Sequence, residues 1–451
     1  MTPTAAILTL GCKVNQYESE AIAEGLAAQG FTIRPSTEVC DLYVINSCTV
    51  TSESDRKARQ AIRRLIKRNP EARVIVTGCA AQIAPEKIAA IPGVDAVIGN
   101  RRKMDVVKAA VRLLGNGPRT AAAVDVPSLA DAAFEPMTIT RFDRTRAYVK
   151  IQDGCESRCT YCTIPRARGP LRSKPLSDVV REVTALTEIG CREVVLTGIE
   201  TGAWGRDLGH LRLQDLLVAV DAIPNIGRIR LGSLDPTVMS EEFVRTVAPL
   251  ASTAPHFHLS MQSGCSATLA RMKRTYNVRM AEAAMARVRD AIPGAQFTTD
   301  IIVGFPGETE EEFAETLAFA RRAEFLHIHV FPYSRRDGTP AADMPDQVDE
   351  AVKRERVARL SEVSRESCAA ILDRTLSEVN ATGRPLRVLF ESRGKGYMTG
   401  HTADFLEVKL PFGKGVPCDL SGREIEVWPV AREGEILLCL PSPPLATAWR
   451  L

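Results

Sequence analysis

Residues 146–162 read RAYVKIQDGCESRCTYC, a short alternating apolar segment followed directly by three closely spaced cysteines. The apolar part, 146–151, predicts a β-strand. Cys155, Cys159 and Cys162 then fall in the loop after the carboxyl end of that strand, which is where (β/α) barrels place their active sites. Three thiolates can hold three irons of a four-iron cluster and leave the fourth iron open to a further ligand. The simpler alternatives are a zinc site that lacks one ligand and a chance clustering of cysteines.

The segments around this loop predict the fold. Five further apolar runs follow the first strand with helical stretches between them, and six such units indicate a partial (β/α) barrel. Before it, runs beginning at residues 5, 41, 72 and 94 alternate with helices, which predicts an open parallel sheet. After it, LRVLFES, FLEVKL, REIEVWPV and EILLCL predict a small antiparallel β-barrel, a common RNA-binding format. The expected boundaries are a first domain at 1–114, a linker at 115–143, the core at 144–377 and the small barrel at 378–442.

The composition excludes several classes of protein. With 451 residues, 45% of them hydrophobic and 25% charged, the chain is typical of globular proteins and not of disordered or collagen-like ones. It has no apolar run of membrane-spanning length and no signal peptide, so we expect a cytoplasmic protein without a membrane partner. In that reducing compartment, 12 cysteines favour metal ligands or reactive thiols over disulfides. The net charge of +3 means that any affinity for nucleic acid must come from local patches.

A second cysteine set is scattered along the first domain. Cys12, Cys48 and Cys79 each follow a predicted parallel strand. Because ligands of open α/β sheets collect at the carboxyl ends of the strands, these thiols can converge on one site. Cysteine is also a common small buried residue at strand ends, and spacing alone does not separate the two interpretations.

These blocks resemble known families. The first cysteine motif, with aromatic Tyr161 before its last cysteine, resembles the radical S-adenosylmethionine (SAM) superfamily. LGCKVNQYESE, VINSCTVTSESDRKARQAIR and VTGCAAQ resemble the amino-terminal domain of the methylthiotransferase family, whose domain order ends in a small barrel called TRAM and covers nearly the whole chain. One departure is HLSMQSGCS, where that pattern has proline at Ser260 and serine at Cys265.

The resemblance implies two [4Fe–4S] clusters and SAM as cofactors. One cluster would be held by Cys155, Cys159 and Cys162, and the other by Cys12, Cys48 and Cys79. The residues implied around SAM are Tyr161, Gly198, Glu200 and Gln262. No catalytic residue beyond the cluster ligands is predicted. Without the resemblance, Gly198 and Glu200 would be an ordinary turn and Gln262 a hydrogen-bonded core amide.

The same resemblance implies radical methylthiolation of carbon 2 of an adenosine in tRNA. GCKVN and LTGIETGAWG are most similar to the group that acts on N6-threonylcarbamoyladenosine at position 37. The alternatives are N6-isopentenyladenosine, a ribosomal-protein aspartate, or a non-enzymatic role as an RNA-binding iron–sulfur redox protein. A substrate that carries a carboxylate requires a cationic partner. The candidates are Arg166, Arg168, Arg271, Lys273 and Arg274, which the sequence does not rank.

The implied partners are the anticodon stem-loop of tRNA and an electron donor such as flavodoxin or ferredoxin. A basic helix at 55–68, together with Arg166, Arg168, Arg172 and Lys174, predicts a track for RNA phosphates. A solvated helix face would explain the same charges. The identity of the donor, the sulfur source, the tRNAs used and the oligomeric state stay open at this level.

Overall fold

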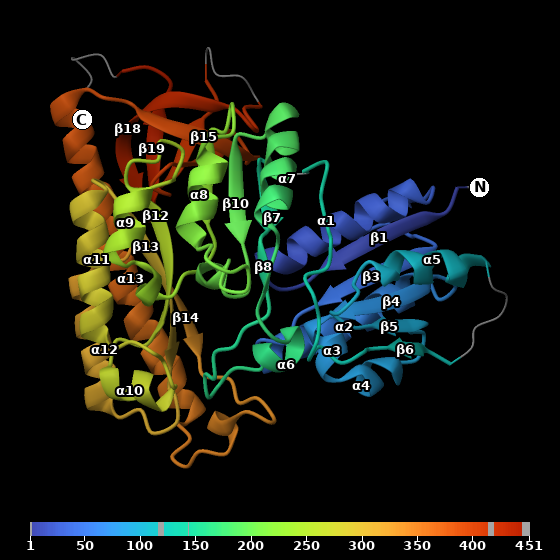
Figure 1. Ribbon diagram of the computed structural model, residues 1–451. Helices are drawn as coiled ribbons and strands as arrows, with labels where there is room; N and C mark the ends of the chain where they lie inside the picture. The colour runs from blue at the N-terminus through green and yellow to red at the C-terminus, as the bar shows by residue number, and fades with distance from the viewer. Residues whose placement is uncertain (1, 116–120, 143, 414–418, 444–451) are drawn as a thin grey trace.

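The computed structural model describes residues 2–115, 121–142, 144–413 and 419–443 (Figure 1). Its three units are a parallel sheet with helices, a partial barrel of parallel strands and a small closed β-barrel. The sheet lies beside the partial barrel, and the closed barrel lies across one end of it (Figure 1). The predicted fold class is confirmed. Among the described residues, no helix is both long and apolar enough to cross a membrane.

The amino-terminal unit is a sheet of six strands in the order β2-β1-β3-β4-β5-β6, and all neighbouring strands are parallel. Every residue of the central strand β3 is buried, as expected where helices cover both faces of a parallel sheet. The strands are β1 (Thr4–Thr9), β2 (Thr32–Ile33), β3 (Leu42–Ser47), β4 (Arg73–Gly78), β5 (Ala96–Ile98) and β6 (Ala123–Asp125). The helices are α1 (Lys13–Ala28), α2 (Ser52–Arg68), α3 (Cys79–Ile83), α4 (Pro85–Ala89) and α5 (Asp105–Gly115).

The segment predicted as a linker, 115–143, contributes to this sheet. Its strand β6 pairs with β5, so the part around residues 123–125 extends the sheet by one strand. All three residues of β6 are exposed, which is why no apolar pattern predicted the strand. Residues 116–120 and 143 of the segment lie outside the described residues.

The central unit has six parallel strands, β7 (Arg146–Lys150), β10 (Glu193–Thr197), β11 (Arg228–Leu231), β12 (His256–Gln262), β13 (Gln296–Val303) and β14 (His327–Pro332). Two isolated bridges, Ile229–Thr253 and Leu234–Leu259, connect the β11 and β12 regions. In the part of the chain that the structure describes, no pairing joins β7 to β14, so the barrel is open on that side.

Helices alternate with these strands. They are α6 (Ile164–Arg168), α7 (Leu176–Glu188), α8 (Leu213–Asp221), α9 (Glu241–Val247), α10 (Ser266–Arg271), α11 (Val278–Ala291), α12 (Glu310–Ala323) and α13 (Glu350–Thr382), with 3₁₀ turns η1 (Thr201–Ala203), η2 (Pro236–Val238) and η3 (Pro340–Ala342). A short antiparallel pair, β8 (Gln152–Asp153) and β9 (Arg172–Ser173), frames the loop that holds the first cysteine motif.

The carboxyl-terminal unit is a closed barrel in the order β15-β16-β17-β19-β18. Its strands are β15 (Leu386–Arg393), β16 (Tyr397–Thr402), β17 (Glu407–Pro411), β18 (Glu424–Glu433) and β19 (Ile436–Leu440). Four of the five pairings are antiparallel, and the parallel pair β17–β19 closes the barrel. Strand β16 was not predicted, because its inward positions are Met398, Gly400 and Thr402 and show no apolar alternation.

The closed barrel covers the amino ends of the central strands. Arg228 on β11 pairs with Glu424 on β18 at 2.5 Å, and Arg146 on β7 pairs with Glu391 on β15. The rings of His256 and Phe405 stack at 4.4 Å. The carboxyl ends of the strands, with their loops, therefore remain for the functional site.

Candidate iron–sulfur site

The first cysteine motif occupies a backbone-bonded loop between β8 and α6. Cys155 N donates to Gly169 O at 3.0 Å, and Cys162 N donates to Cys159 O at 3.2 Å. Gly154 has φ +75°, and a Cβ there would lie 1.8 Å from the carbonyl oxygen of Pro170, so only glycine allows this approach. Backbone contacts that do not involve the thiols therefore help to shape the loop.

The second cysteine set lies at one edge of the amino-terminal sheet. Cys12 follows β1 at the start of α1, Cys48 follows β3, and Cys79 follows β4 as the first residue of α3. These strands are neighbours and parallel, so their carboxyl ends share an edge. A Cβ on Gly11 would lie 3.1 Å from the sulfur of Cys48, which shows how closely the chain before Cys12 approaches that thiol.

The two cysteine sets face each other across the domain boundary. Arg168, at the end of α6, donates from Nε to the sulfur of Cys79 at 3.3 Å. The Asn100 side chain donates to Ala167 O at 2.8 Å and lies 3.9 Å from the same sulfur. Cys79 is also close enough to Cys162 to raise the pKa of that thiol. The structure thus brings all six predicted ligands to one region.

The surroundings of the thiols suit thiolates that are stabilised by metal. Burial raises the pKa of Cys155 to about 12 and that of Cys162 to about 11, so these thiols would be protonated without a metal. One sulfur of each set also accepts a hydrogen bond from an arginine. Arg274 Nη1 donates to Cys159 at 3.1 Å, and Arg168 Nε donates to Cys79 at 3.3 Å. Metal binding releases thiol protons, and such donors stabilise the resulting charge. The donor set therefore fits two thiolate-held clusters.

Glu200 and Gly198 lie after β10 beside the first motif. Glu200 N donates to the Gln152 side chain at 2.7 Å, and Gly198 packs closely against the same side chain. The Glu200 carboxylate is near enough to Cys155 to raise its pKa, and Glu200 Oε2 is buried without a hydrogen-bond partner among the described residues. An oxygen of Glu200 that is buried beside Cys155 without a partner is better explained by a bound ammonium group than by an ordinary turn.

Tyr161 and Gln262 border the same region. The Tyr161 ring meets Phe305 edge-on at 6.4 Å. Gln262 has φ 67°, a left-handed conformation uncommon for this residue type, and coincides with an irregularity in the β12–β13 pairing. Its half-buried side chain makes no hydrogen bond to another described residue, so it is not the bonded core amide that the simpler interpretation expected. Strained non-glycine positions of this kind cluster at binding sites.

A buried ion network connects the two domains behind the thiols. Glu18 on α1 accepts from Arg168 at 2.5 Å and Lys150 at 2.8 Å, and it also pairs with Lys103. Asp153 pairs with Lys150 at 2.7 Å and Arg172 at 3.1 Å. Sequence reasoning missed this network, because its members come from distant parts of the chain and only the fold brings them together.

This network, together with the buried pair of Lys174 and Glu182, corrects two expectations. Arg168, Arg172 and Lys174 are 0%, 5% and 2% exposed, so they do not belong to a surface phosphate track. Arg168 is also occupied by Glu18 and Cys79 and is not available to a substrate carboxylate. Of the other candidates, Arg271 pairs with Glu312 at 2.8 Å and Arg274 with Asp235 at 2.8 Å, whereas Arg166 and Lys273 are exposed.

Glu18→Gln should destabilise the protein strongly. Removing one partner of a buried ion pair leaves uncompensated charge, and we expect the free energy of unfolding to fall by about 3–5 kcal/mol. The measurement is thermal unfolding under anaerobic conditions. Glu53→Gln, which removes an exposed partner of Arg56, is the control and should leave the unfolding temperature nearly unchanged. Equal unfolding temperatures for the two variants would contradict a stabilising role for the network.

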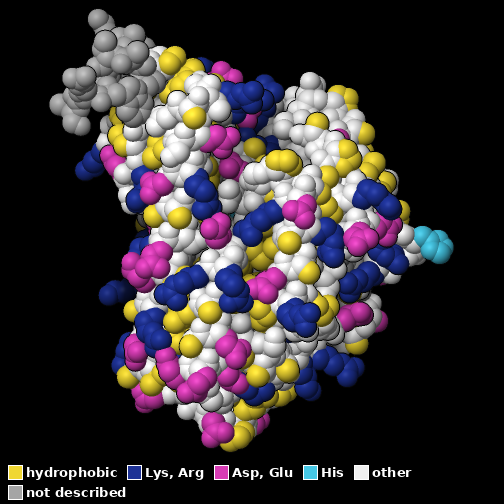
Figure 2. Space-filling model, turned by 90° about the vertical axis from the view of Figure 1, so that its left-hand side faces the viewer, with side chains coloured by type: hydrophobic (Ala, Val, Ile, Leu, Met, Phe, Trp, Pro, Cys, Tyr) yellow, Lys and Arg dark blue, Asp and Glu magenta, His cyan; other side chains and the backbone are white. Residues whose placement is uncertain are grey.

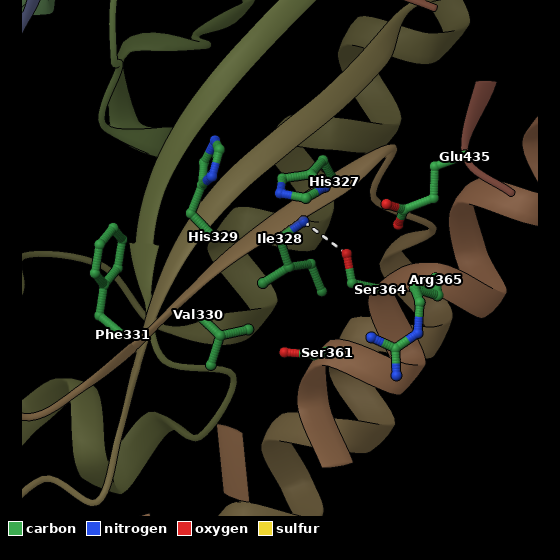
Figure 3. A pocket seen from close by; sticks show the side chains of 9 residues that line it. All are labelled: His327, Ile328, His329, Val330, Phe331, Ser361, Ser364, Arg365 and Glu435. Atoms are coloured by element: carbon green, nitrogen blue, oxygen red, sulfur yellow. Dashed lines mark hydrogen bonds between the residues drawn. The ribbon is translucent and has the colours of Figure 1, made fainter. Parts of the chain in front are cut away.

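A separate pocket of about 350 Å³ lies along the edge strand β14, beside α13 and the β18–β19 turn. His327 and His329 project from the same side of β14, and Ile328 N donates to the Ser364 hydroxyl at 2.9 Å (Figure 3). His329 also lies beside His258 and Asp300, whose Nε2 and Oδ2 are 3.3 Å apart. These side chains add polar groups to the open side of the barrel.

Two family models match the chain. Residues 4–99 match an uncharacterized protein family, UPF0004, and residues 149–320 match the radical SAM superfamily. Among solved structures, the radical SAM methyltransferase TsrM of Kitasatospora setae is similar with a TM-score of 0.55. It is 17% identical and covers 76% of this chain and 77% of its own, which supports the fold alone.

Relatives match over most of the chain. The threonylcarbamoyladenosine tRNA methylthiotransferase MtaB of Bacillus subtilis is 40% identical, over 94% of this chain and 93% of its own length. Its counterpart from Thermotoga maritima is 38% identical over 80% and 82%. A tRNA-2-methylthio-N(6)-dimethylallyladenosine synthase from Dictyoglomus thermophilum is 34% identical over 89% and 91%.

Proposed function

This chain belongs to the radical SAM methylthiotransferase family, and from that premise we propose that it methylthiolates carbon 2 of N6-threonylcarbamoyladenosine at position 37 of tRNA. The observation that carries the chemistry is the pair of cysteine sets that face each other, each with a guanidinium donor to one sulfur. The choice of base is supported by the named activity of the relatives at 40% and 38% identity. The relative that is named for the alternative base, dimethylallyladenosine, is 34% identical to this chain.

The cofactors of this family are SAM and two [4Fe–4S] clusters. When bound, they supply a radical that removes hydrogen from carbon 2 of adenine and a methylated sulfur that replaces it. Cys155, Cys159 and Cys162 would hold one cluster, and Cys12, Cys48 and Cys79 the other. Arg168 connects the two cysteine sets. It lies on α6, which begins two residues after Cys162 in the central unit, and it donates a hydrogen bond to the sulfur of Cys79 in the amino-terminal unit. Reacting groups must meet at about 3–3.5 Å, so this connection matters for the reaction.

The residues proposed around SAM have distinct tasks. The Glu200 carboxylate, whose Oε1 lies 3.7 Å from Arg206 Nη1 and whose Oε2 has no hydrogen-bond partner among the described residues, would receive the ammonium group of SAM through Oε2. Gly198 would allow the close backbone approach. The unbonded amide of Gln262 would contact the nucleoside, and Tyr161 would line the pocket beside Phe305. These assignments remain proposals.

One experiment separates an enzyme from the redox-protein alternative. The anaerobically reconstituted protein, given a strong reductant, should convert SAM to 5′-deoxyadenosine and methionine. A protein whose clusters only transfer electrons would release neither product. An activity on a ribosomal-protein aspartate would leave SAM cleavage intact but give no tRNA product.

The reduction also requires a one-electron donor, and we propose one of the flavodoxin or ferredoxin type. We place the reaction in the cytoplasm, since tRNA is the proposed substrate and no disulfide joins any of the eleven described cysteines.

The exposed face of α2 is the better-supported part of the phosphate track. Arg59, Arg63, Arg64 and Lys67 are exposed, whereas Arg68 donates to the carbonyl of Ser36. The start of α2 contacts the central unit, where Ser52 N donates to Ser334 at 3.1 Å and Asp55 pairs with Arg336 at 2.7 Å. On the face with α11, α12 and α13, by contrast, Figure 2 shows basic and acidic side chains interspersed.

Neutralising Arg63, Arg64 and Lys67 to glutamine should weaken tRNA binding. Each lost phosphate contact should lower the slope of log K against log salt by roughly 0.7–0.9, so the defect shrinks as salt rises. The control replaces three exposed arginines of α12 and α13, Arg321, Arg354 and Arg365, by glutamine. Titration of tRNA at several salt concentrations measures both. The track does not lie on α2 if the two triple variants bind alike.

A further inference from the structure

Arg274 lies close to the first cysteine motif, although it comes from the segment that follows α10. Its Nη1 donates to the sulfur of Cys159 at 3.1 Å, and its side chain is 11% exposed. Two further bonds join the same segments, since Thr160 N donates to Met272 O at 3.1 Å and Thr160 Oγ1 donates to Arg271 O at 2.9 Å. The guanidinium therefore lies beside the sulfur because the chain around both residues is held together.

Each nitrogen of this guanidinium has a partner. Nη2 of Arg274 donates to Asp235 Oδ2 at 2.8 Å, and Nε donates to the Tyr276 hydroxyl at 3.0 Å. Tyr276 is itself buried, and its hydroxyl donates to Ser260 O at 2.6 Å. These contacts fix the plane of the guanidinium, so that Nη1 is directed at Cys159. A planar group held in this way is ready to respond to a change of charge on the sulfur.

The charge of Arg274 distinguishes its bond from others at this motif. Cys162 accepts from a neutral donor, Ile164 N, at 3.4 Å. Reduction adds an electron to a thiolate-held cluster, and a cation that donates to a ligand sulfur stabilises the added negative charge. The effect is stronger in a buried site than in water, because the local dielectric constant is lower. Arg274 should therefore raise the reduction potential of a cluster held by this motif.

We infer that Arg274 tunes the cluster of the first motif so that a donor of the flavodoxin or ferredoxin type can reduce it. The inference rests on the proposed function. The donor is oxidised by one electron and the cluster is reduced by one. That electron then passes to SAM, whose bond between sulfur and C5′ breaks to give methionine and the 5′-deoxyadenosyl radical. Arg274 contacts a proposed cluster ligand and not the reacting atoms, so it acts by positioning charge.

The test is a redox titration of the reconstituted holoenzyme, followed by electron paramagnetic resonance. Because SAM binds the open iron of the first motif's cluster, its addition identifies the signal of that cluster. Arg274→Gln should lower the equilibrium constant for one-electron reduction about tenfold, which is a fall of about 59 mV. Arg274→Lys keeps the charge without the planar fork and should lie between that variant and the parent. The control, Arg322→Gln, removes an arginine of α12 that pairs with Glu282 at 2.8 Å and should leave the potential unchanged.

The choice of reductant separates tuning from a structural role. With reduced flavodoxin, Arg274→Gln should cleave SAM about tenfold more slowly than the parent. With an excess of dithionite, a stronger reductant, it should cleave SAM at nearly the parental rate, and its iron content should equal that of the parent. An unchanged potential, an equal defect with both reductants, or a loss of iron would each overturn the tuning role. If the parent cleaves no SAM with either reductant, the proposed function fails instead.

Discussion

Simultaneous replacement of Cys155, Cys159 and Cys162 by alanine abolishes SAM cleavage and removes roughly half of the reconstituted iron, because a thiolate-held cluster does not persist without its ligands. The loop should keep its shape. Its backbone bonds, such as Cys155 N to Gly169 O at 3.0 Å, do not involve the thiols, and the β8–β9 pair frames it. The loss is therefore chemical and not a failure to fold.

The matched control is a triple alanine variant of Cys40, Cys191 and Cys368, buried cysteines outside both sets. It should retain all of the iron and full SAM cleavage. The measurements are iron content, the absorbance of the clusters and the yield of 5′-deoxyadenosine. Unchanged iron in the Cys155, Cys159 and Cys162 variant would refute the cluster assignment.

Replacing Cys12, Cys48 and Cys79 together by alanine should separate the two halves of the reaction. SAM cleavage should continue, because the first motif and Glu200 are untouched, whereas methylthiolated tRNA should disappear entirely. The remaining iron should again be roughly half, now held by the other set. The loss of Cys79 removes an acceptor of Arg168, but Glu18 and Asn15 still hold that guanidinium, each at 2.5 Å.

The comparison that decides this prediction is product formation against SAM cleavage in the same sample. The Cys40, Cys191 and Cys368 variant again serves as the control and should form product. Methylthiolated tRNA from the Cys12, Cys48 and Cys79 variant would make these cysteines structural and remove the second cluster from the account.

The sequence predicted well those features that depend on short stretches of neighbouring residues. Cysteines that follow neighbouring parallel strands can converge at one edge of a sheet, so the convergence of Cys12, Cys48 and Cys79 could be predicted without coordinates. The pattern alone did not separate cluster ligands from small buried residues. The strands of the core were equally clear, since each begins a short apolar or alternating run, whether it is buried throughout as in β10 or alternates as in β12. Strand β16 was not predicted because its inward positions include Gly400 and Thr402. Strand β6 was not predicted because it is exposed.

Charged residues were harder to place. A run of arginine and lysine after the first motif resembles a solvated surface, and only the fold reveals that Glu18 and Asp153, distant in sequence, neutralise Arg168 and Arg172 in the interior.

The most direct test of the central claim is mass spectrometry of tRNA nucleosides from a strain that lacks this gene. The account predicts that 2-methylthio-N6-threonylcarbamoyladenosine disappears, that its precursor without the methylthio group accumulates, and that expression of the intact chain restores the product. Persistence of that nucleoside, together with loss of the isopentenyl counterpart, would contradict the account and assign the protein to the other base.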